Sequence, residues 1–215
     1  MPRTQLTAEE SKTLILDHAE RLFRDIGYSK TTMGDIAEAC GFSPSNVHRH
    51  FRTKRDINEA IAERILRGKE TLALNAAGLA SDPRDKLKTL LRMLHAGTID
   101  ALISEKRVHE MVAVACEERW RAVADYRERV RGHIRAIIED GAAARGLSPG
   151  EIDRAASALF SSCTAILHPL IVAENMEFNP DRGPDVLIDF VVDGVAAQLF
   201  KDADVPASFP LDGAG

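Results

Sequence analysis

Residues 32–51 read TMGDIAEACGFSPSNVHRHF, and this segment is the strongest indication of structure in the N-terminal part of the chain. It predicts two short helices joined by a tight turn. Ala37 is small, so a second helix can approach the first, and Gly41 tolerates the left-handed backbone that commonly ends a helix. Val47 is the apolar residue that would dock the second helix onto the first. The spacing of these three residues predicts a helix-turn-helix.

Helix-capping residues at both starts agree with this prediction. Thr32 is followed three residues later by Asp35, which resembles a short capping box. Ser43 precedes Pro44, which places a cap before a first-turn proline. The alternative is a pair of amphipathic helices in an ordinary bundle, where alanine and glycine also occur.

The charge pattern favours a helix-turn-helix that binds DNA. Residues 40–55 contain no Asp or Glu, although the whole chain carries a net charge of -5. The basic residues of the stretch are Arg49, Arg52, Lys54 and Arg55. Residues 1–70 hold 12 lysines and arginines against 11 acidic residues, whereas residues 71–215 hold 16 against 22. We therefore expect a polyanion to dock on the N-terminal part and to be repelled by the remainder.

The second helix, over residues 44–50, is expected to lie in the major groove of double-stranded DNA. Asparagine can form two hydrogen bonds with adenine, and arginine can form two with guanine, so Asn46 and Arg49 are the leading base readers. Thr32 and Lys54 lie at helix N-termini, which favour phosphate, and His48 is assigned to the DNA backbone together with them. The complete set of expected DNA contacts is Thr32, Ser43, Ser45, Asn46, His48, Arg49 and Lys54.

These motifs resemble a known family. The matching residues are Thr31, Thr32, Ile36, Ala37, Gly41, Phe42, Ser43, Val47, Phe51 and Lys54. Over residues 10–65 the chain is similar to the N-terminal domain of TetR/AcrR-type transcriptional regulators. The resemblance implies a homodimer that binds a palindromic operator and is released by a small-molecule effector, with repression more common than activation. The family usually has Tyr where this chain has His48, whose imidazole N–H could replace the phenolic donor.

The rest of the chain predicts an all-α fold of about nine helices. Hydrophobic residues make up 45% of the sequence and aromatic residues only 5%, and alternating β-branched runs are missing. We expect a three-helix DNA-binding domain over residues 1–54 and a larger ligand-binding and dimerisation domain over residues 55–215. Outside the helix-turn-helix, the expected helices cover residues 11–26, 54–72, 83–102, 108–116, 119–145, 149–171 and 185–200.

Two segments, residues 155–172 and 186–199, are apolar on more than one face. A helix of this kind must bury both faces, and one of them could pack on a second subunit. The alternative is that both are central core helices of a monomer. The residues expected at a dimer interface are Leu159, Cys163, Leu167, Leu187, Phe190, Val191 and Val195.

The C-terminal domain should then enclose an effector pocket. Candidate contacts combine a large apolar body with, in some cases, a polar tip. They are Met93, His95, Met111, Trp120, Tyr126, Phe160 and His168. Each is individually more typical of a core position. The modest aromatic content and the lack of buried-looking Arg or Lys favour an uncharged or weakly polar apolar effector. The spacing of the histidines does not match a pair of metal ligands.

Other functional classes have less support. The sequence has no Gly-x-Ser-x-Gly, no His-Glu-x-x-His and no glycine-rich phosphate loop, so neither enzymatic activity nor a cofactor is expected. The three cysteines are far apart and fit reduced thiols. Without an 18-residue apolar run or a signal-peptide pattern, the expected location is the cytoplasm, with no membrane partner. The main rival is a helical protein-interaction scaffold that does not bind DNA.

Overall fold

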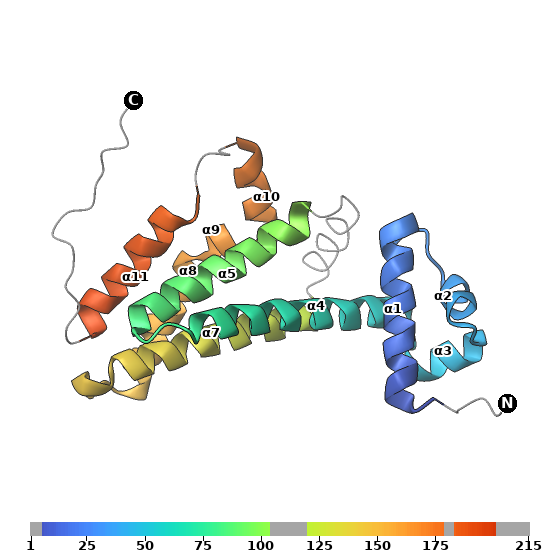
Figure 1. Ribbon diagram of the computed structural model, residues 1–215, viewed down its shortest axis with the longest axis horizontal. Coiled ribbons are helices and arrows are strands. Elements are labelled where there is room, and N and C mark those ends of the chain that lie inside the picture. Colours follow the sequence, from blue (N-terminus) through green and yellow to red (C-terminus); the bar gives the residue numbers. More distant parts are fainter. Residues whose placement is uncertain (1–5, 104–119, 179–182, 201–215) are drawn as a thin grey trace. The chain divides into compact units, whose positions relative to one another are not determined.

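The computed structural model describes residues 6–103, 120–178 and 183–200, which form ten α-helices, one short 3-10 helix and no strand (Figure 1). The N-terminal helices are α1 (Ala8–Ile26), α2 (Met33–Cys40), α3 (Pro44–His50), α4 (Lys54–Ala77) and α5 (Pro83–Ile103). The later elements are α7 (Arg121–Gly141), η1 (Ala143–Arg145), α8 (Pro149–Ser162), α9 (Thr164–Leu167), α10 (Pro169–Phe178) and α11 (Asp185–Leu199). The predicted all-α fold is confirmed.

The described residues divide into two compact units. The first holds residues 6–70, 97–103 and 120–128, and the second holds residues 71–96, 129–178 and 183–200. The boundary expected between residues 54 and 55 coincides with the start of α4, whose first part belongs to the first unit. Among the helices described, none combines the length and the apolar character that crossing a bilayer requires.

The first unit has an apolar core cluster, to which α1, α2, α3 and α4 all contribute residues. Its fully or almost fully buried members are Ile15, Ala19, Phe23, Ile36, Ala37, Val47, Ile57 and Ile61. At the rim of this cluster, Arg64 of α4 bonds Asp17 of α1 at 2.6 Å and Glu20 of α1 at 2.5 Å. Ala37 and Val47, which the sequence predicts at the contact between the two short helices, are among these buried residues.

Local caps begin several helices. Thr32 and Asp35 form a complete capping box at α2, and Ser43 caps α3 ahead of Pro44, as predicted. One cap was missed. Thr7 and Glu10 form a capping box before α1, so this helix begins at Ala8 rather than near residue 11.

The second unit is held together partly by charge. Basic side chains of α5 alternate with acidic side chains of α11 to form a ladder of ion pairs. The pairs are Arg84–Asp193 (3.6 Å), Lys88–Asp193 (2.9 Å), Lys88–Asp189 (3.0 Å), Arg92–Asp189 (3.2 Å) and Arg92–Asp185 (2.6 Å). The spacing of these residues within each segment does not by itself predict this ladder.

Two predicted helices differ from the structure. The helix expected over residues 149–171 is in fact three helices, with breaks at Cys163 and His168. His168 is extended because the ring of Pro169 disfavours a helical backbone before it and removes a hydrogen-bond donor. The helix expected over residues 119–145 ends at Gly141 and is followed by η1. The helix expected over residues 108–116 lies outside the described residues.

Candidate nucleic-acid interface

The turn between α2 and α3 has the geometry that the sequence predicts. Gly41 adopts the left-handed conformation (φ 66°, ψ 27°), and its N–H donates to Glu38 O. The next N–H, of Phe42, donates to Ala37 O at 2.9 Å, which satisfies a carbonyl at the end of α2. Val47 is fully buried in the apolar cluster, so α3 docks on α1 and α2 through this residue.

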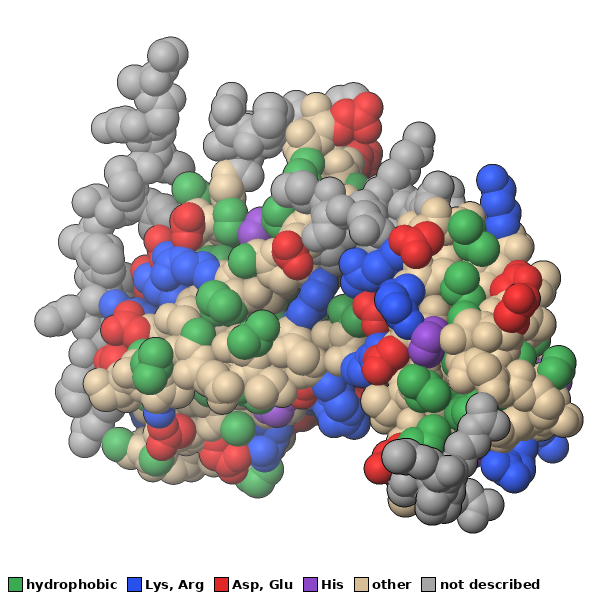
Figure 2. Space-filling view, turned by 45° about the vertical axis from the view of Figure 1, so that its right-hand side comes forward, with side chains coloured by type: hydrophobic (Ala, Val, Ile, Leu, Met, Phe, Trp, Pro, Cys, Tyr) green, Lys and Arg blue, Asp and Glu red, His purple; other side chains and the backbone are tan. Residues whose placement is uncertain are grey.

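The outward side of α3 carries the expected base readers. Ser43, Ser45, His48 and Arg49 are exposed, and Asn46 is half-buried. Figure 2, in which the region bearing α1–α3 is turned forward, shows basic and acidic side chains at its surface. The absence of acidic residues is therefore a property of residues 40–55 rather than of the whole region.

Several of these side chains already contact one another. Arg49 donates from Nη2 to Asn46 Oδ1 at 3.0 Å, and the hydroxyls of Ser43 and Ser45 lie 3.0 Å apart. A bidentate contact with adenine needs both the amide oxygen and the amide nitrogen of asparagine. Because Asn46 Oδ1 accepts from Arg49, the observed arrangement orients the guanidinium and leaves Asn46 one lone pair of Oδ1 and its amide N–H groups.

The two expected phosphate contacts outside α4 already take part in hydrogen bonds within the protein. Thr32 Oγ1 accepts from the Asp35 N–H at 3.2 Å. The Thr32 backbone N–H donates to Asp35 Oδ2 at 2.8 Å, and this bond, ahead of that of the hydroxyl, lowers the pKa of Asp35. His48 Nδ1 lies 3.2 Å from Arg52 O, so it carries the hydrogen of that bond. A neutral His48 ring then offers Nε2 as an acceptor rather than a donor.

Lys54 is placed differently from the other expected contacts. Its Nζ lies 2.6 Å from Tyr28 O, 2.8 Å from Thr31 O and 3.5 Å from Ser29 O. The same atom sits 4.4 Å from the centroid of the Tyr28 ring. The side chain therefore turns toward the connection between α1 and α2.

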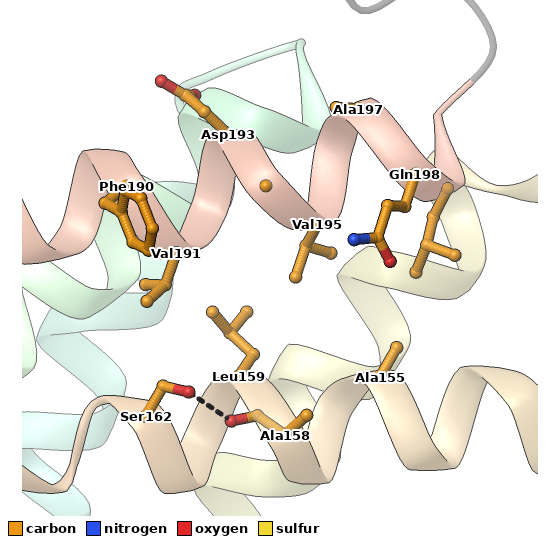
Figure 3. Close-up of a pocket in the computed structure, with 12 residues that line it drawn as sticks. Ala155, Ala158, Leu159, Ser162, Phe190, Val191, Asp193, Val195, Ala197 and Gln198 are labelled. Carbon is orange, nitrogen blue, oxygen red and sulfur yellow. Dashed lines mark hydrogen bonds between the residues drawn. The ribbon is translucent and has the colours of Figure 1, made fainter. Parts of the chain in front are cut away.

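A second candidate surface lies on the C-terminal helices. A groove of about 470 Å³ runs between α8 and α11 (Figure 3). Phe190, at its edge, is 58% exposed. The lining residues are Ala155, Ala158, Leu159, Ser162, Phe190, Val191, Asp193, Gly194, Val195, Ala197, Gln198 and Leu199. Ser162 donates its hydroxyl hydrogen to Ala158 O at 2.9 Å, so this polar group is satisfied within α8.

The groove includes part of the expected dimer interface. Its lining contains Leu159, Phe190, Val191 and Val195. Cys163 is fully buried in its own unit, which is at odds with its assignment to a subunit interface. Leu167 and Leu187 are half-buried and do not line the groove. The small residues of the groove are not among the predicted interface residues, because alanine and glycine carry a weak apolar signal.

The expected effector contacts are not part of this groove. Met93, His95, Phe160 and His168 belong to the second unit, Trp120 and Tyr126 belong to the first, and Met111 lies outside the described residues. Trp120 is only 1% exposed.

Two histidines of the second unit and two cysteines, Cys40 of the first unit and Cys163 of the second, are buried to different degrees. His95 Nδ1 donates to Ile166 O at 2.7 Å, whereas His168 Nδ1 is buried without a hydrogen-bond partner. No group of three or more potential metal ligands occurs within the described ranges. Cys40 and Cys163 are free thiols, and burial raises their pKa values to about 11 and about 12.

The docked second helix, its exposed polar side and the lack of acidic residues between positions 40 and 55 define a DNA-binding helix-turn-helix protein. Residues 15–61 match the model of bacterial regulatory proteins of the tetR family, and residues 83–185 match the tetracyclin repressor-like C-terminal domain. The chain is 30% identical over 175 residues to the HTH-type transcriptional regulator TtgR of Pseudomonas putida, covering 74% of this chain and 79% of TtgR. The probable regulator ArpR of Pseudomonas putida matches to the same extent.

A solved structure agrees with this result. A tetR-family regulator from Mesorhizobium loti superposes with a TM-score of 0.63 at 21% identity, covering 92% of this chain and 100% of that one. The chain belongs to the TetR family of bacterial transcriptional regulators. Proteins of this family are regulators and not enzymes, in agreement with the lack of catalytic motifs.

Proposed function

We propose that this protein is a ligand-responsive repressor that binds a palindromic operator as a homodimer and is released by a small apolar effector. The observation that carries the proposal is the outward side of α3. It presents Asn46 and Arg49 beside each other, within a stretch free of acidic residues. An exposed arginine oriented by a neighbour suits bidentate recognition of guanine.

The contacts divide into base readers and phosphate contacts. Arg49 is assigned to a guanine, with Asn46 orienting it or reading an adjacent base. Ser43 and Ser45 lie at the start of α3 and can bond either a base or a phosphate. Thr32 is assigned to a phosphate, and so is His48 in its doubly protonated form, because the neutral ring uses its one N–H on Arg52 O. Lys54 is the third residue expected in that group, although its ammonium is already bonded to backbone carbonyls.

Dimerisation is assigned to the groove between α8 and α11. Exposed apolar side chains such as Phe190 border small residues, so a symmetry-related pair of helices could fill the groove. Each large apolar side chain buried in this way contributes about 1.5–3 kcal/mol. In such a dimer the two recognition helices should lie about 34–36 Å apart, or a multiple of it, to reach successive major grooves.

Effector control is assigned to the C-terminal domain, with α4 as the lever. An effector can shift the DNA-binding equilibrium only by its differential affinity for the two conformations. Relatives support repression and a small ligand. KstR2 of Rhodococcus jostii and BepR of Brucella suis are named repressors, and a TetR-family repressor of Thermus thermophilus was solved with lauroyl-CoA.

The proposal is tested by DNA binding followed by selection of binding sites from a random library. We expect salt-dependent binding to a palindrome upstream of a coding region, and loss of preference at one base pair per half-site, by about 1–3 kcal/mol, in Arg49→Ala. Failure to bind DNA, together with capture of a protein partner, would instead support the scaffold function.

Asn46→Asp separates the two roles of Asn46. Aspartate keeps the acceptor that orients Arg49 but removes the donor that adenine N7 requires. If Asn46 orients Arg49, the guanine preference persists in Asn46→Asp and weakens in Asn46→Ala. If Asn46 reads adenine, both substitutions remove a preference at a neighbouring position and leave the guanine preference intact.

A further inference from the structure

The feature that carries a further inference is the environment of the Lys54 ammonium. A lysine ammonium has three N–H donors and no acceptor. Its Nζ is surrounded by three carbonyl oxygens, of Tyr28 at 2.6 Å, Thr31 at 2.8 Å and Ser29 at 3.5 Å. All three donors therefore have a backbone acceptor, and none is left for a phosphate oxygen in this arrangement.

The location of these carbonyls explains why a cation is needed there. They follow the C-terminus of α1, where the helix dipole and the last helical carbonyls create negative potential. The Tyr28 ring lies 4.4 Å from the same Nζ and adds a cation–π contact. Burial lowers the pKa of Lys54 below the usual lysine value, in line with an ammonium withdrawn from water.

The turn that Lys54 holds leads directly into a helix expected to contact DNA. The hydroxyl of Thr31 donates to Gly27 O at 2.9 Å, and the next residue, Thr32, caps α2. Lys54 is the first residue of α4, whose own start is fixed by Thr53 and Asp56. One side chain thus ties the start of α4 to the residues that position the N-terminus of α2.

We propose that Lys54 is a positioning residue that clamps the α1–α2 turn to the first turn of α4, rather than a phosphate contact. The clamp makes the orientation of α2 depend on the position of α4. The expected effect of Lys54 on operator binding rests on the proposed function. Its expected effect on the turn can be measured on the protein without DNA.

The protein arm uses amide hydrogen exchange of the full chain. Lys54→Met keeps a long apolar stem but removes every donor, so exchange in residues 27–33 should accelerate by about tenfold or more. Lys30→Met is the matched control, because it removes the same charge from an exposed position in the same turn. Tyr28→Leu removes only the ring and should give a smaller acceleration. Equal exchange in Lys54→Met and in the unaltered protein would overturn the clamp.

The DNA arm measures operator affinity against salt concentration. A lost phosphate contact lowers the slope of log K against log salt by about 0.9, whereas a lost positioning residue lowers affinity at an unchanged slope. We expect Lys54→Met to weaken specific binding about tenfold, by analogy with the loss of hydrogen bonds to a charged group, with the slope preserved. The proposal would be overturned if Lys54→Met lowered the slope of log K against log salt by about 0.9 and left amide exchange unchanged, because that result would show a phosphate contact.

The two arms separate failure of this inference from failure of the proposed function. If the unaltered protein binds no DNA sequence specifically, the proposed function fails, while the exchange measurement still decides whether Lys54 clamps the turn. If the protein binds its operator and Lys54→Met behaves like Lys30→Met in both measurements, the clamp alone is wrong.

Discussion

The helix-turn-helix and the pairing of α5 with α11 are stabilised in different ways. In α1–α3, caps join residues three positions apart, and an apolar cluster closes the unit. Between α5 and α11, ion pairs such as Arg92–Asp185 join residues 93 positions apart. Apolar packing depends little on ionic strength, whereas partly exposed ion pairs are screened by salt. The two regions should therefore respond differently to mutation, salt and pH.

The largest expected effect concerns Phe190, a residue of α11 that is not part of the ion-pair ladder. Phe190→Asp places a charge where the proposed dimer would bury an aromatic ring, so association should weaken by at least about 100-fold and operator binding should be lost with it. Sedimentation and DNA binding measure the two effects. Leu79→Asp is the control, because Leu79 is 90% exposed and lies outside the groove. An unaltered protein that is monomeric at micromolar concentration would contradict dimerisation.

The next largest effect is expected in the apolar cluster of the first unit. Ile36 is fully buried in the cluster of the first unit, so Ile36→Ala should destabilise that unit by about 2–5 kcal/mol. The loss should be nearly the same at low and high salt, because no charge is involved. Amide exchange of α1–α3 measures it locally. Ile26→Ala, at a position 40% exposed, should cost much less. If the loss of stability in Ile36→Ala depended strongly on salt, the contrast drawn between the apolar cluster and the ion-pair ladder would be wrong.

Lys88→Met tests the ladder of ion pairs between α5 and α11. The Lys88 and Asp193 side chains are only 16% and 12% exposed, so removing the ammonium leaves a carboxylate largely cut off from solvent. We expect a loss of about 1–3 kcal/mol in the second unit, and we expect salt to destabilise the unaltered protein more than the variant. Arg67→Met, which removes a more exposed helical ion pair, is the control.

Lys88 also predicts a dependence on alkaline pH. Desolvation lowers its pKa, but the hydrogen bonds and charges of Asp193 and Asp189 outweigh that effect and raise the pKa above the usual lysine value. Its contribution is therefore complete below the usual lysine pKa and is lost as pH rises through the higher folded value. If the packing of α11 lost the same stability at alkaline pH in Lys88→Met and in the unaltered protein, this assignment would be contradicted.

The two regions also differ in how far the sequence predicted them. The caps and the turn at Gly41 were predictable, because each depends on residues within about five positions. The break before Pro169 had a local signal that the apolar run on both sides obscured. The ladder depends on which helices meet, so its aspartates, spaced four apart on α11, were not recognised as partners of α5. Lys54 was assigned to DNA because sequence shows its charge but not the carbonyls around it.

The smallest expected effect tests whether one cap is as local as its geometry indicates. Thr32→Ala removes the hydroxyl that accepts from the Asp35 N–H, so α2 should lose about 0.5–2 kcal/mol. Thr13→Ala is the control, since Thr13 is exposed within α1 and its loss removes no cap. Because the Thr32 N–H lowers the pKa of Asp35, the carboxylate stabilises α2 above the usual aspartate pKa, and this contribution is lost as pH falls through the lower folded value. Asp35→Asn should abolish that pH dependence, while Thr32→Ala, which keeps the backbone donor, should retain most of it. Accelerated exchange confined to α2 is the expected result for both variants, and acceleration extending into α5 or α11 would show that the cap is not local.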